Sequence, residues 1–376
     1  MHGALGSAVV HGRRGACDPS QTAMEPMVAE ADANLRVARL IDANLDRARE
    51  GLRVIEDWCR FGLDRDDLVV PLKDWRQRLG QQHHDRYRRA RSTATDVAAG
   101  LGHPAQASRG TAQAIVKANA SRVQEALRVL EEFGRNLDPA LASTSAEIRY
   151  GLYDLEVRIL EACGRQHRQE RLEAAKLCLI TDPDRDNNLE RLLQGVEAAL
   201  VAGVSLVQYR RKQGNDQQRL LEAQALKTLC SRFEALFIIN DRIDLALLVD
   251  ADGVHLGQDD LPLSEARQLL GPERLLGRST HCLEHLLAAQ KEGADYLGVG
   301  PVFATATKRD RRPAGLSWVT EASLHAAVPW FAIGGIDVET IPSVRAAGAQ
   351  RVAVVSAIMG SNHPEEASRT LLQALS

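Results

Sequence analysis

From Leu177 onward, the sequence alternates short apolar runs with longer amphipathic segments, and this alternation restricts the fold more than any other feature of the chain. Strand-sized apolar runs separated by helical patterns predict parallel β/α units. Eight such runs in about 200 residues predict a closed (β/α)8 barrel, the TIM-barrel fold, near the lower limit of its size. The predicted strands are Leu177–Thr181, Ser205–Arg210, Leu236–Asp241, Gly253–Gly257, Leu275–Ser279, Tyr296–Val302, Trp330–Ile336 and Arg351–Ala357.

An open, doubly wound α/β sheet is the alternative fold for the same alternation. Sheets of that kind that bind a dinucleotide carry a glycine-rich turn after the first strand. In this chain the first predicted strand is followed by Asp182, Pro183 and Asp184. The sequence therefore favours the barrel, with the open sheet as the second choice.

Residues 34–165, ahead of the barrel, place apolar side chains at helical spacing. They contain an internal repeat, because residues 43–57 align with residues 118–132 at one constant offset. Such self-similarity indicates a duplicated structural unit, so we predict a separate all-α domain with an internal repeat. The predicted divisions are a disordered tail at 1–33, the all-helical domain at 34–165, a linker at 166–176 and the barrel at 177–376.

The composition is that of an ordinary globular protein, with 44% hydrophobic residues, 26% charged residues and a net charge of −3. This charge gives no electrostatic basis for nucleic-acid binding, and the basic run at residues 86–91 is interpreted as a solvated helix face. No apolar stretch approaches the roughly 20 residues that cross a bilayer. The six cysteines lack CxxC spacing, which is typical of reduced thiols. We expect a cytoplasmic protein with small-molecule partners, and the sequence allows a homo-oligomer.

Basic and amide side chains follow the second predicted strand. Gln208, Arg210 and Lys212 alternate at period two, so they are expected to point the same way. The catalytic groups of a (β/α)8 barrel lie at the C-terminal ends of its strands. These three residues are therefore predicted to converge on a ligand above the barrel.

Two carboxylates follow the next two strands. Asn240 and Asp241 end the third strand, and Asp260 lies just after the fourth. Mg²⁺ takes one or two carboxylates together with substrate phosphates, so Asp241 and Asp260 are candidate ligands for Mg²⁺. The alternative is that Asp241 caps the following helix and Asp260 opens a turn.

Hydroxyls, an ammonium group and bare backbone follow the later strands. Small hydroxyls hydrogen-bond phosphates or heterocycles, and backbone N–H groups after strands seven and eight commonly bind phosphate in this fold. The residues are Ser279, Thr305, Thr307, Lys308, Gly334, Gly335, Val355 and Ser356. His255 lies inside the fourth strand and is interpreted as a core or wall residue, not as a base. We therefore predict two anionic pockets, one for a metal-assisted diphosphate and one for a monophosphate.

Residues 177–376 resemble thiamine-phosphate synthase, which joins the pyrimidine and thiazole halves of thiamine. The matching motifs are Gln208-x-Arg210-x-Lys212, Asn240-Asp241, Gly257-Gln258-x-Asp260, Ser279, Thr305-x-Thr307-Lys308, Gly334-Gly335 and Val355-Ser356. The resemblance implies three sets of site residues. Gln208, Arg210, Lys212, Asn240, Ser279 and Lys308 would hold the pyrimidine diphosphate, with Arg210, Lys212 and Lys308 catalytic. Asp241 and Asp260 would bind Mg²⁺, and Thr305, Ala306, Thr307, Gly335, Val355 and Ser356 would hold the thiazole phosphate.

Two other functions remain open for the barrel, a thiazole-phosphate tautomerase and a non-catalytic phosphate sensor. The intact diphosphate and metal residues argue against both. The helical domain resembles an N-terminal domain suggested to be a pyrimidine-phosphate kinase, and a structural, dimerising or ligand-sensing module is the alternative. Our hypothesis is that Asn44, Asn119, Arg53 and Arg128 form a phosphate-binding site buried where the two repeat copies face each other. The alternative is that these residues form i,i+3 pairs on the surface of solvated helices.

Two residues of the loop after strand six, Lys308 and Thr307, are predicted to bind different substrates. Lys308→Ala should lower kcat by about 100-fold, because charge grows on the departing diphosphate in the transition state. Thr307→Ala should instead raise the KM for the thiazole phosphate about tenfold, by loss of one hydrogen bond to a charged group. Steady-state kinetics with each substrate varied would show both effects, and the reverse pattern would mean that the assignments are exchanged.

Overall fold

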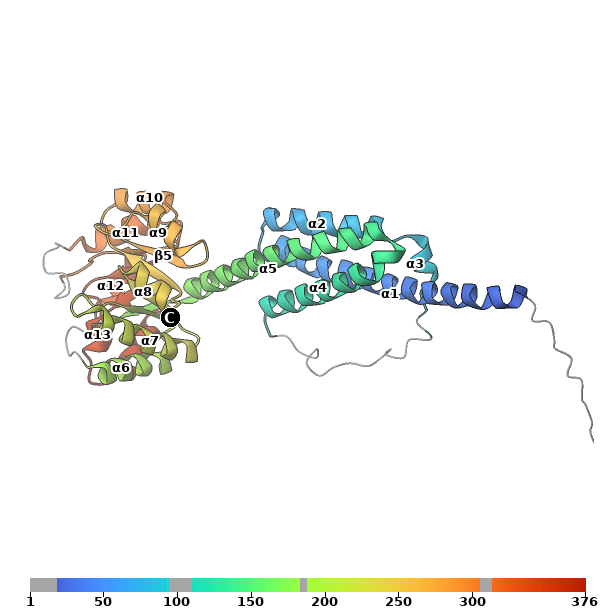
Figure 1. Cartoon of the computed structure of the whole chain (residues 1–376). Helices are drawn as coiled ribbons and strands as arrows, with labels where there is room; N and C mark the ends of the chain where they lie inside the picture. Colours follow the sequence, from blue (N-terminus) through green and yellow to red (C-terminus); the bar gives the residue numbers. More distant parts are fainter. Residues whose placement is uncertain (1–18, 93, 95–109, 183–187, 305–312) are drawn as a thin grey trace, which may run out of the picture. The chain divides into compact units, whose positions relative to one another are not determined.

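The structure is a computed structural model that describes residues 19–376 except for 93, 95–109, 183–187 and 305–312. The chain divides into two compact units, with the boundary between Leu160 and Glu161. Figure 1 shows that one unit is helical and the other is a strand barrel surrounded by helices. No described helix has both the length and the apolar character needed to span a bilayer.

The first unit is built from long helices. They are α1 (Pro19–Phe61), α2 (Asp66–Gln81), α3 (Asp85–Arg89), α4 (Ala112–Leu137) and the N-terminal part of α5 (Pro139–Ala174). Helix α1 packs against both α2 and α4 (Figure 1). A Cβ atom on Gly51 of α1 would lie 2.5 Å from Cγ2 of Val123 on α4, so the two backbones approach closely there. The side chains buried completely between these helices include Ile41, Leu45, Leu52, Ile55, Leu68, Leu72, Leu79, Tyr87 and Leu127.

The two copies of the repeat lie on α1 and α4, but they do not form the buried phosphate site of our hypothesis. Asn44 and Asn119 are buried, and each amide donates to the carbonyl four residues earlier at 2.9 Å. Arg53 and Arg128 remain 49% and 53% exposed and pair with carboxylates on their own helices. The prediction that these arginines are buried between the copies is therefore wrong. Intrahelical pairing satisfies their charges at the surface.

Two predicted boundaries of the helical region are also wrong. Helix α1 begins at Pro19, so residues 19–33 are helical, while residues 1–18 lie outside the described part. Helix α5 continues to Ala174 through most of the predicted linker at 166–176. Polarity alone does not end a helix, because Arg, Gln and Glu are good helix formers and residues 165–174 contain neither glycine nor proline.

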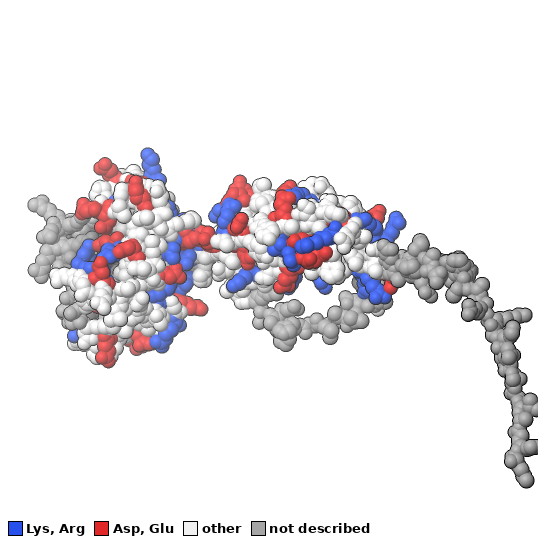
Figure 2. Space-filling model, viewed as in Figure 1, with Lys and Arg blue, Asp and Glu red and all other residues white. Residues whose placement is uncertain are grey.

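The arginines of the basic run at residues 86–91 are exposed, as predicted, but two of them also pair with buried carboxylates. Arg86 donates to Asp138 at 2.6 Å, and the buried Tyr87 hydroxyl donates to the same carboxylate at 2.7 Å. Arg91 donates to both oxygens of the buried Asp42, at 2.7 and 3.0 Å. These arginines thus hold residues 85–91 onto the rest of the helical unit. Figure 2 shows that basic and acidic side chains are interspersed over the visible face of both units.

The second unit is a closed parallel barrel, which confirms the predicted fold. The strands are β1 (Leu177–Ile180), β2 (Leu206–Tyr209), β3 (Leu236–Asn240), β4 (Gly253–Leu256), β5 (Leu275–Thr280), β6 (Tyr296–Val299), β7 (Trp330–Ile333) and β8 (Val352–Val354). They pair in sequence order, and β8 closes on β1. All eight predicted strands are present, most with one to three fewer residues at their ends. The surrounding helices are α6 (Leu189–Val201), α7 (Asp216–Arg232), α8 (Ile243–Leu248), α9 (Leu263–Leu270), α10 (Leu283–Lys291), α11 (Gly315–His325), α12 (Ile341–Ala346), α13 (Ser356–Met359) and α14 (Pro364–Ala374).

Period-two alternation along the strands divides the apolar side chains of the barrel between two cores. Outward-facing residues such as Phe237 and Ile239 pack against the helices. The inward-facing core consists of Leu172, Ala175, Cys178, Ile180, Leu206, Leu236, Ile238, Leu275, Tyr296, Phe331 and Ala353. Leu172 belongs to α5, so the last turn of that helix supplies part of the barrel interior.

Most helices of the barrel pass into the next strand through the same joint. The second residue after the helix has a positive φ, as at Gly203, Glu234, Asp250, Gly293 and Gly348. The next residue donates its N–H to the carbonyl five residues earlier, as Ala235 does to Cys230 at 2.9 Å. This is the Schellman arrangement, in which a left-handed residue ends a helix.

Two buried aspartates bind the C-terminal part of α5 to the N-terminal end of the barrel. Asp295, just before β6, accepts hydrogen bonds from Arg165 at 2.8 Å, Arg267 at 2.6 Å and the Leu276 amide at 2.8 Å. Asp252, just before β4, is placed in the same way. It accepts from Arg168 at 3.2 Å, Lys227 at 3.4 Å and the Phe237 amide at 2.9 Å. Each buried carboxylate thus satisfies two cations and one strand N–H group.

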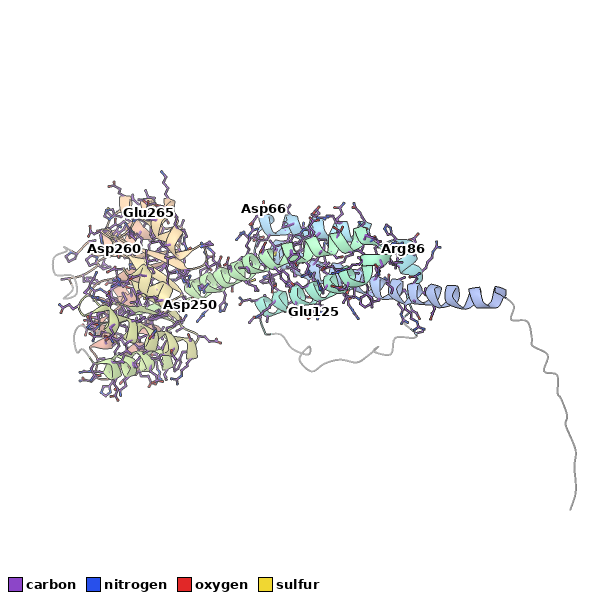
Figure 3. The ribbon with its side chains drawn as sticks, in the orientation of Figure 1. Asp66, Arg86, Glu125, Asp250, Asp260 and Glu265 are labelled. Carbon is purple, nitrogen blue, oxygen red and sulfur yellow. The ribbon has the colours of Figure 1, made fainter. Side chains whose placement is uncertain are left out.

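Asp295→Asn should lower the free energy of unfolding of the barrel by about 3 kcal/mol, because it leaves two arginines without their buried carboxylate. Asp250→Asn is the matched control. Asp250 also lies at this end of the barrel, opposite Asp260 (Figure 3), but it is 76% exposed and pairs with Arg274. Its substitution should cost less than about 1 kcal/mol. Hydrogen exchange of β5 and β6 would measure the difference, and equal losses would contradict the role assigned to Asp295.

Candidate active site

A cavity of about 410 Å³ lies in the C-terminal half of the barrel. Its wall contains ten of the predicted site residues, which come from six different strands or the turns after them. These are Gln208, Arg210, Lys212, Asn240, Asp241, Asp260, Ser279, Gly335, Val355 and Ser356. The structure therefore brings together residues that are far apart in the sequence, with 148 positions between Gln208 and Ser356. The other predicted residues, Thr305, Ala306, Thr307 and Lys308, lie outside the described residues.

The segment after β2 turns alternate side chains toward the cavity, as predicted. Gln208, Arg210 and Lys212 line the cavity, whereas Tyr209 and Arg211 face away from it. The Tyr209 hydroxyl donates to the buried Glu222 at 2.7 Å, and Arg211 donates to both oxygens of the same carboxylate at 2.8 and 2.9 Å. Burial and the Glu222 carboxylate raise the pKa of Tyr209, so its hydroxyl stays protonated. This network fixes the orientation of the basic segment.

The sequence did not reveal the residues that support this segment. Glu222 lies on α7, ten residues beyond Lys212, in a helix whose pattern gives no sign of a buried carboxylate. Thr181 follows β1, and its hydroxyl accepts a hydrogen bond from the Arg210 amide at 3.0 Å. The Thr181 contact forms only when β1 and β2 pair, and the Glu222 contacts form only when α7 packs on β2, so no local sequence motif indicates either.

The two predicted metal ligands lie together at the mouth of the cavity. Lys212 Nζ lies 2.6 Å from Oδ2 of Asp241, and the Gly257 amide donates to Asp260 at 2.6 Å. Burial raises the pKa of Asp260 above its ordinary value, and the neighbouring Asp241 carboxylate raises it further, while the Gly257 amide opposes the shift. A carboxylate whose ionisation is disfavoured beside a second carboxylate forms a place where a divalent cation would be stabilising.

The carboxylates of Asp241 and Asp260 can bind a hard cation such as Mg²⁺ only if a substrate supplies further oxygen ligands. Across the described ranges, no group of three or more His, Cys, Asp or Glu side chains is arranged to hold a metal ion. Two carboxylates alone leave most of an octahedral shell open, and Mg²⁺ commonly fills it with water and phosphate oxygens. The residues present therefore suit an ion that arrives with a phosphate ligand.

Ser279 lies deeper in the cavity, at an inward-facing position of β5. Its main-chain carbonyl accepts a hydrogen bond from the Gln258 side chain at 2.5 Å. Its hydroxyl lies 3.0 Å from Nε2 of His255, an inward-facing residue of the neighbouring strand β4. Asn240 on β3 is paired in register with His255. These polar residues lie close together in the cavity wall. His255 is thus a wall residue, as we interpreted it from the sequence.

The opposite side of the cavity is formed by main chain after β7 and β8. Gly334 and Gly335 have φ values of +105° and +64°, which favour glycine. A Cβ atom on Gly335 would lie 2.8 Å from both Phe303 Cβ and the Ala304 carbonyl oxygen. This part of the wall can therefore be formed only by bare backbone.

Comparisons with known proteins give both units a family. A family model described as thiamine monophosphate synthase matches residues 177–358, and one described as the ThiD2 family matches residues 39–158. The thiamine-phosphate synthase of Synechococcus sp. (strain CC9311) is 92% identical over 94% of this chain and 100% of that protein. The chain belongs to the thiamine-phosphate synthase family. It is an enzyme, a transferase of thiamine biosynthesis, as the resemblance of its motifs implied.

Two further thiamine-phosphate synthases extend the likeness. The protein of Prochlorococcus marinus (strain MIT 9303) is 61% identical over 94% of this chain and 100% of its own length. Among solved structures, the thiamine phosphate pyrophosphorylase from Pyrococcus furiosus is 35% identical and has a TM-score of 0.50. It covers 55% of this chain and 96% of its own. The thiamine-phosphate synthase likeness thus includes the barrel in both sequence and fold.

Gly335→Ala should lower kcat/KM for the thiazole phosphate by at least about tenfold, because its methyl group would displace the main chain at residues 303–304. Gly293→Ala is the matched control, since Gly293 also has a positive φ, +85°, but nothing lies within 4 Å of its missing Cβ. The control should cost about 1 kcal/mol of stability and leave catalysis intact. Steady-state kinetics and thermal unfolding of both variants would separate the local clash from general strain.

Proposed function

We propose that this cavity couples 4-amino-2-methyl-5-(diphosphooxymethyl)pyrimidine to 4-methyl-5-(2-phosphooxyethyl)thiazole, or to its 2-carboxy form, by dissociative loss of diphosphate. The proposal depends on one observation, namely that the two sides of a single cavity have different chemistry. The basic and amide residues and the carboxylates suit a diphosphate, and the bare backbone at Gly335, Val355 and Ser356 suits a monophosphate. Such a cavity holds both reactants at once, and orientation of this kind can supply much of a rate enhancement.

In this proposal the pyrimidine diphosphate lies against Gln208, Asn240 and Ser279. Arg210 and Lys212, together with Lys308, neutralise the charge that grows on the departing diphosphate. Asp241 and Asp260 would hold Mg²⁺, which when bound would offset further negative charge on the phosphate oxygens. Thr305, Ala306 and Thr307 would complete the thiazole-phosphate side.

The reaction proposed needs no protein nucleophile. The aminopyrimidine ring delocalises the positive charge left when the C–O bond breaks, and the thiazole nitrogen then attacks the methylene carbon. Among the described residues of the cavity wall, Cys178 is the only cysteine, and burial raises the pKa of its thiol to about 12, so it stays protonated and inert. The chain's role is then to bind, to orient and to stabilise the leaving group.

Asp241→Asn and Asp260→Asn should each lower kcat at limiting Mg²⁺ by about 100-fold, because each removes an anionic oxygen ligand. High Mg²⁺ should partly restore both. Asp244→Asn is the control, because Asp244 is exposed on α8 and pairs with Arg242. It should leave the Mg²⁺ dependence unchanged, as measured by initial rates over a Mg²⁺ titration. Near-normal activity of both site variants at limiting Mg²⁺ would reject the metal assignment.

For the helical unit we propose phosphorylation of the pyrimidine monophosphate that precedes the barrel reaction, with a structural module as the alternative. The match to the ThiD2 family supports an independent role. Arg47 and Arg122 occupy equivalent positions in the two repeat copies, and both are exposed. Neither makes an ion pair with any residue of the described ranges. Their charges are therefore available to a phosphate group, unlike those of Arg53 and Arg128.

With ATP, Mg²⁺ and thiazole phosphate, the full chain should convert pyrimidine monophosphate to thiamine phosphate. The double variant Arg47→Ala/Arg122→Ala should lose this activity by at least about tenfold and keep the coupling of supplied pyrimidine diphosphate. Arg53→Ala/Arg128→Ala is the matched control and should retain both activities. If the full chain cannot use the monophosphate, the structural module is correct.

The remaining expectations concern the setting of the enzyme. We propose a cytoplasmic location and small-molecule substrates alone. The described cysteines Cys59, Cys163, Cys178, Cys230 and Cys282 form no disulfide, which supports a reducing compartment. A homo-oligomer stays a prediction.

A further inference from the structure

His255 occupies a slot that the barrel interior builds for it. The side chain points inward from β4 and is 8% exposed. On the neighbouring strand, a Cβ atom on Gly277 would lie 2.6 Å from Nδ1 of His255. On the next strand, a Cβ atom on Gly298 would lie 3.2 Å from Cε1 of the same ring. Two glycines thus provide the space for one imidazole.

The floor of the slot is aromatic and fixes the plane of the ring. The centroid of Tyr296 lies 5.5 Å from that of His255, and Tyr296 packs edge-on against Phe331 with centroids 6.0 Å apart. A side chain held on several sides by buried groups keeps one rotamer. The direction of its ring nitrogens is therefore set before any substrate binds.

The nitrogen Nε2 of His255 meets the Ser279 hydroxyl at 3.0 Å, and Gln258 holds the Ser279 carbonyl at 2.5 Å. A serine hydroxyl has one proton and two lone pairs, and it rotates freely unless a partner fixes it. If Nε2 accepted that proton, only lone pairs would face the cavity, which would repel an anionic diphosphate. If Nε2 carries a proton and donates it, the hydroxyl proton is left to point at the ligand.

We infer that His255 is a positioning residue for the coupling reaction. Its Nε2–H donates to the Ser279 hydroxyl oxygen and so aims the hydroxyl proton at an oxygen of the pyrimidine diphosphate. Because charge on that oxygen grows as the diphosphate departs, the aimed hydrogen bond strengthens in the transition state. The inference rests on the proposed role of Ser279 in holding this substrate. His255 itself transfers no proton and does not touch the reacting atoms.

Kinetics of the full-length enzyme with both substrates test the inference. His255→Ala should lower kcat by about 10- to 100-fold, the usual range for a residue that orients a functional group. The KM for the pyrimidine diphosphate should change by less than about threefold, because the bond strengthens only in the transition state. His255→Gln, whose amide can still donate toward Ser279, should recover most of the lost turnover.

A double-mutant cycle distinguishes positioning from packing. If His255 acts through Ser279, His255→Ala/Ser279→Ala should be no slower than Ser279→Ala alone. Phe331→Leu is the control, because it alters the same floor without a hydrogen-bonding group, and its effect should multiply with that of Ser279→Ala. Thermal unfolding of each variant shows that the cycle compares folded proteins.

Three results would each contradict either the positioning role of His255 or the proposed function of Ser279. Multiplicative losses in the histidine–serine cycle, or a glutamine variant as slow as the alanine variant, would overturn the positioning role alone. A Ser279→Ala enzyme with near-normal turnover would instead overturn the proposed function of Ser279, on which the inference rests. Multiplicative losses together with a slow Ser279→Ala enzyme would overturn the positioning role and leave the proposed function intact.

Discussion

The interior of a closed eight-stranded barrel has to be filled by the side chains that point into it, and the rest of this structure depends on how that space is divided. At the N-terminal end the filling is apolar, with Tyr296, Phe331 and Leu172 among its members. Toward the C-terminal end, polar residues and glycines occupy inward positions beside apolar residues such as Ile180 and Ile333, and the cavity lies there. The buried apolar core at the N-terminal end thus holds the polar residues at the C-terminal end in fixed positions.

Charge inside the cavity is balanced before any ligand arrives. Lys212 pairs with Asp241, while burial and Asp241 raise the pKa of Asp260. Arg211, the basic residue between Arg210 and Lys212, is directed to Glu222 on the outer side of the strand. The strand end can therefore carry three consecutive cations, because the middle one is neutralised away from the site. Without Glu222, the buried guanidinium of Arg211 would lose its carboxylate partner at a large cost.

The sequence predicted the strands and the cavity residues because both depend on short-range patterns. Alternation at period two is visible in Gln208, Arg210 and Lys212 themselves, and the chain direction places strand ends together. The supporting contacts were not predictable, since the hydroxyl of Thr181 and the imidazole of His255 act on partners in the next β/α unit, and the carboxylate of Glu222 acts across the loop between β2 and α7. The end of α5 was missed for a different reason. The polar composition of residues 165–170 does not end the helix, because Arg, Gln and Glu are good helix formers.

The joints between helices and strands show where the barrel tolerates strain. Glycine takes the left-handed position at Gly203, Gly293 and Gly348, but Asp250 and Glu234 take it elsewhere. Aspartate visits this conformation with modest penalty, whereas a longer side chain without a local hydrogen bond is disfavoured by about 1 kcal/mol or more. The turn at Glu234 is therefore the joint from which a more heat-resistant enzyme could be engineered most directly, at a position remote from the chemistry.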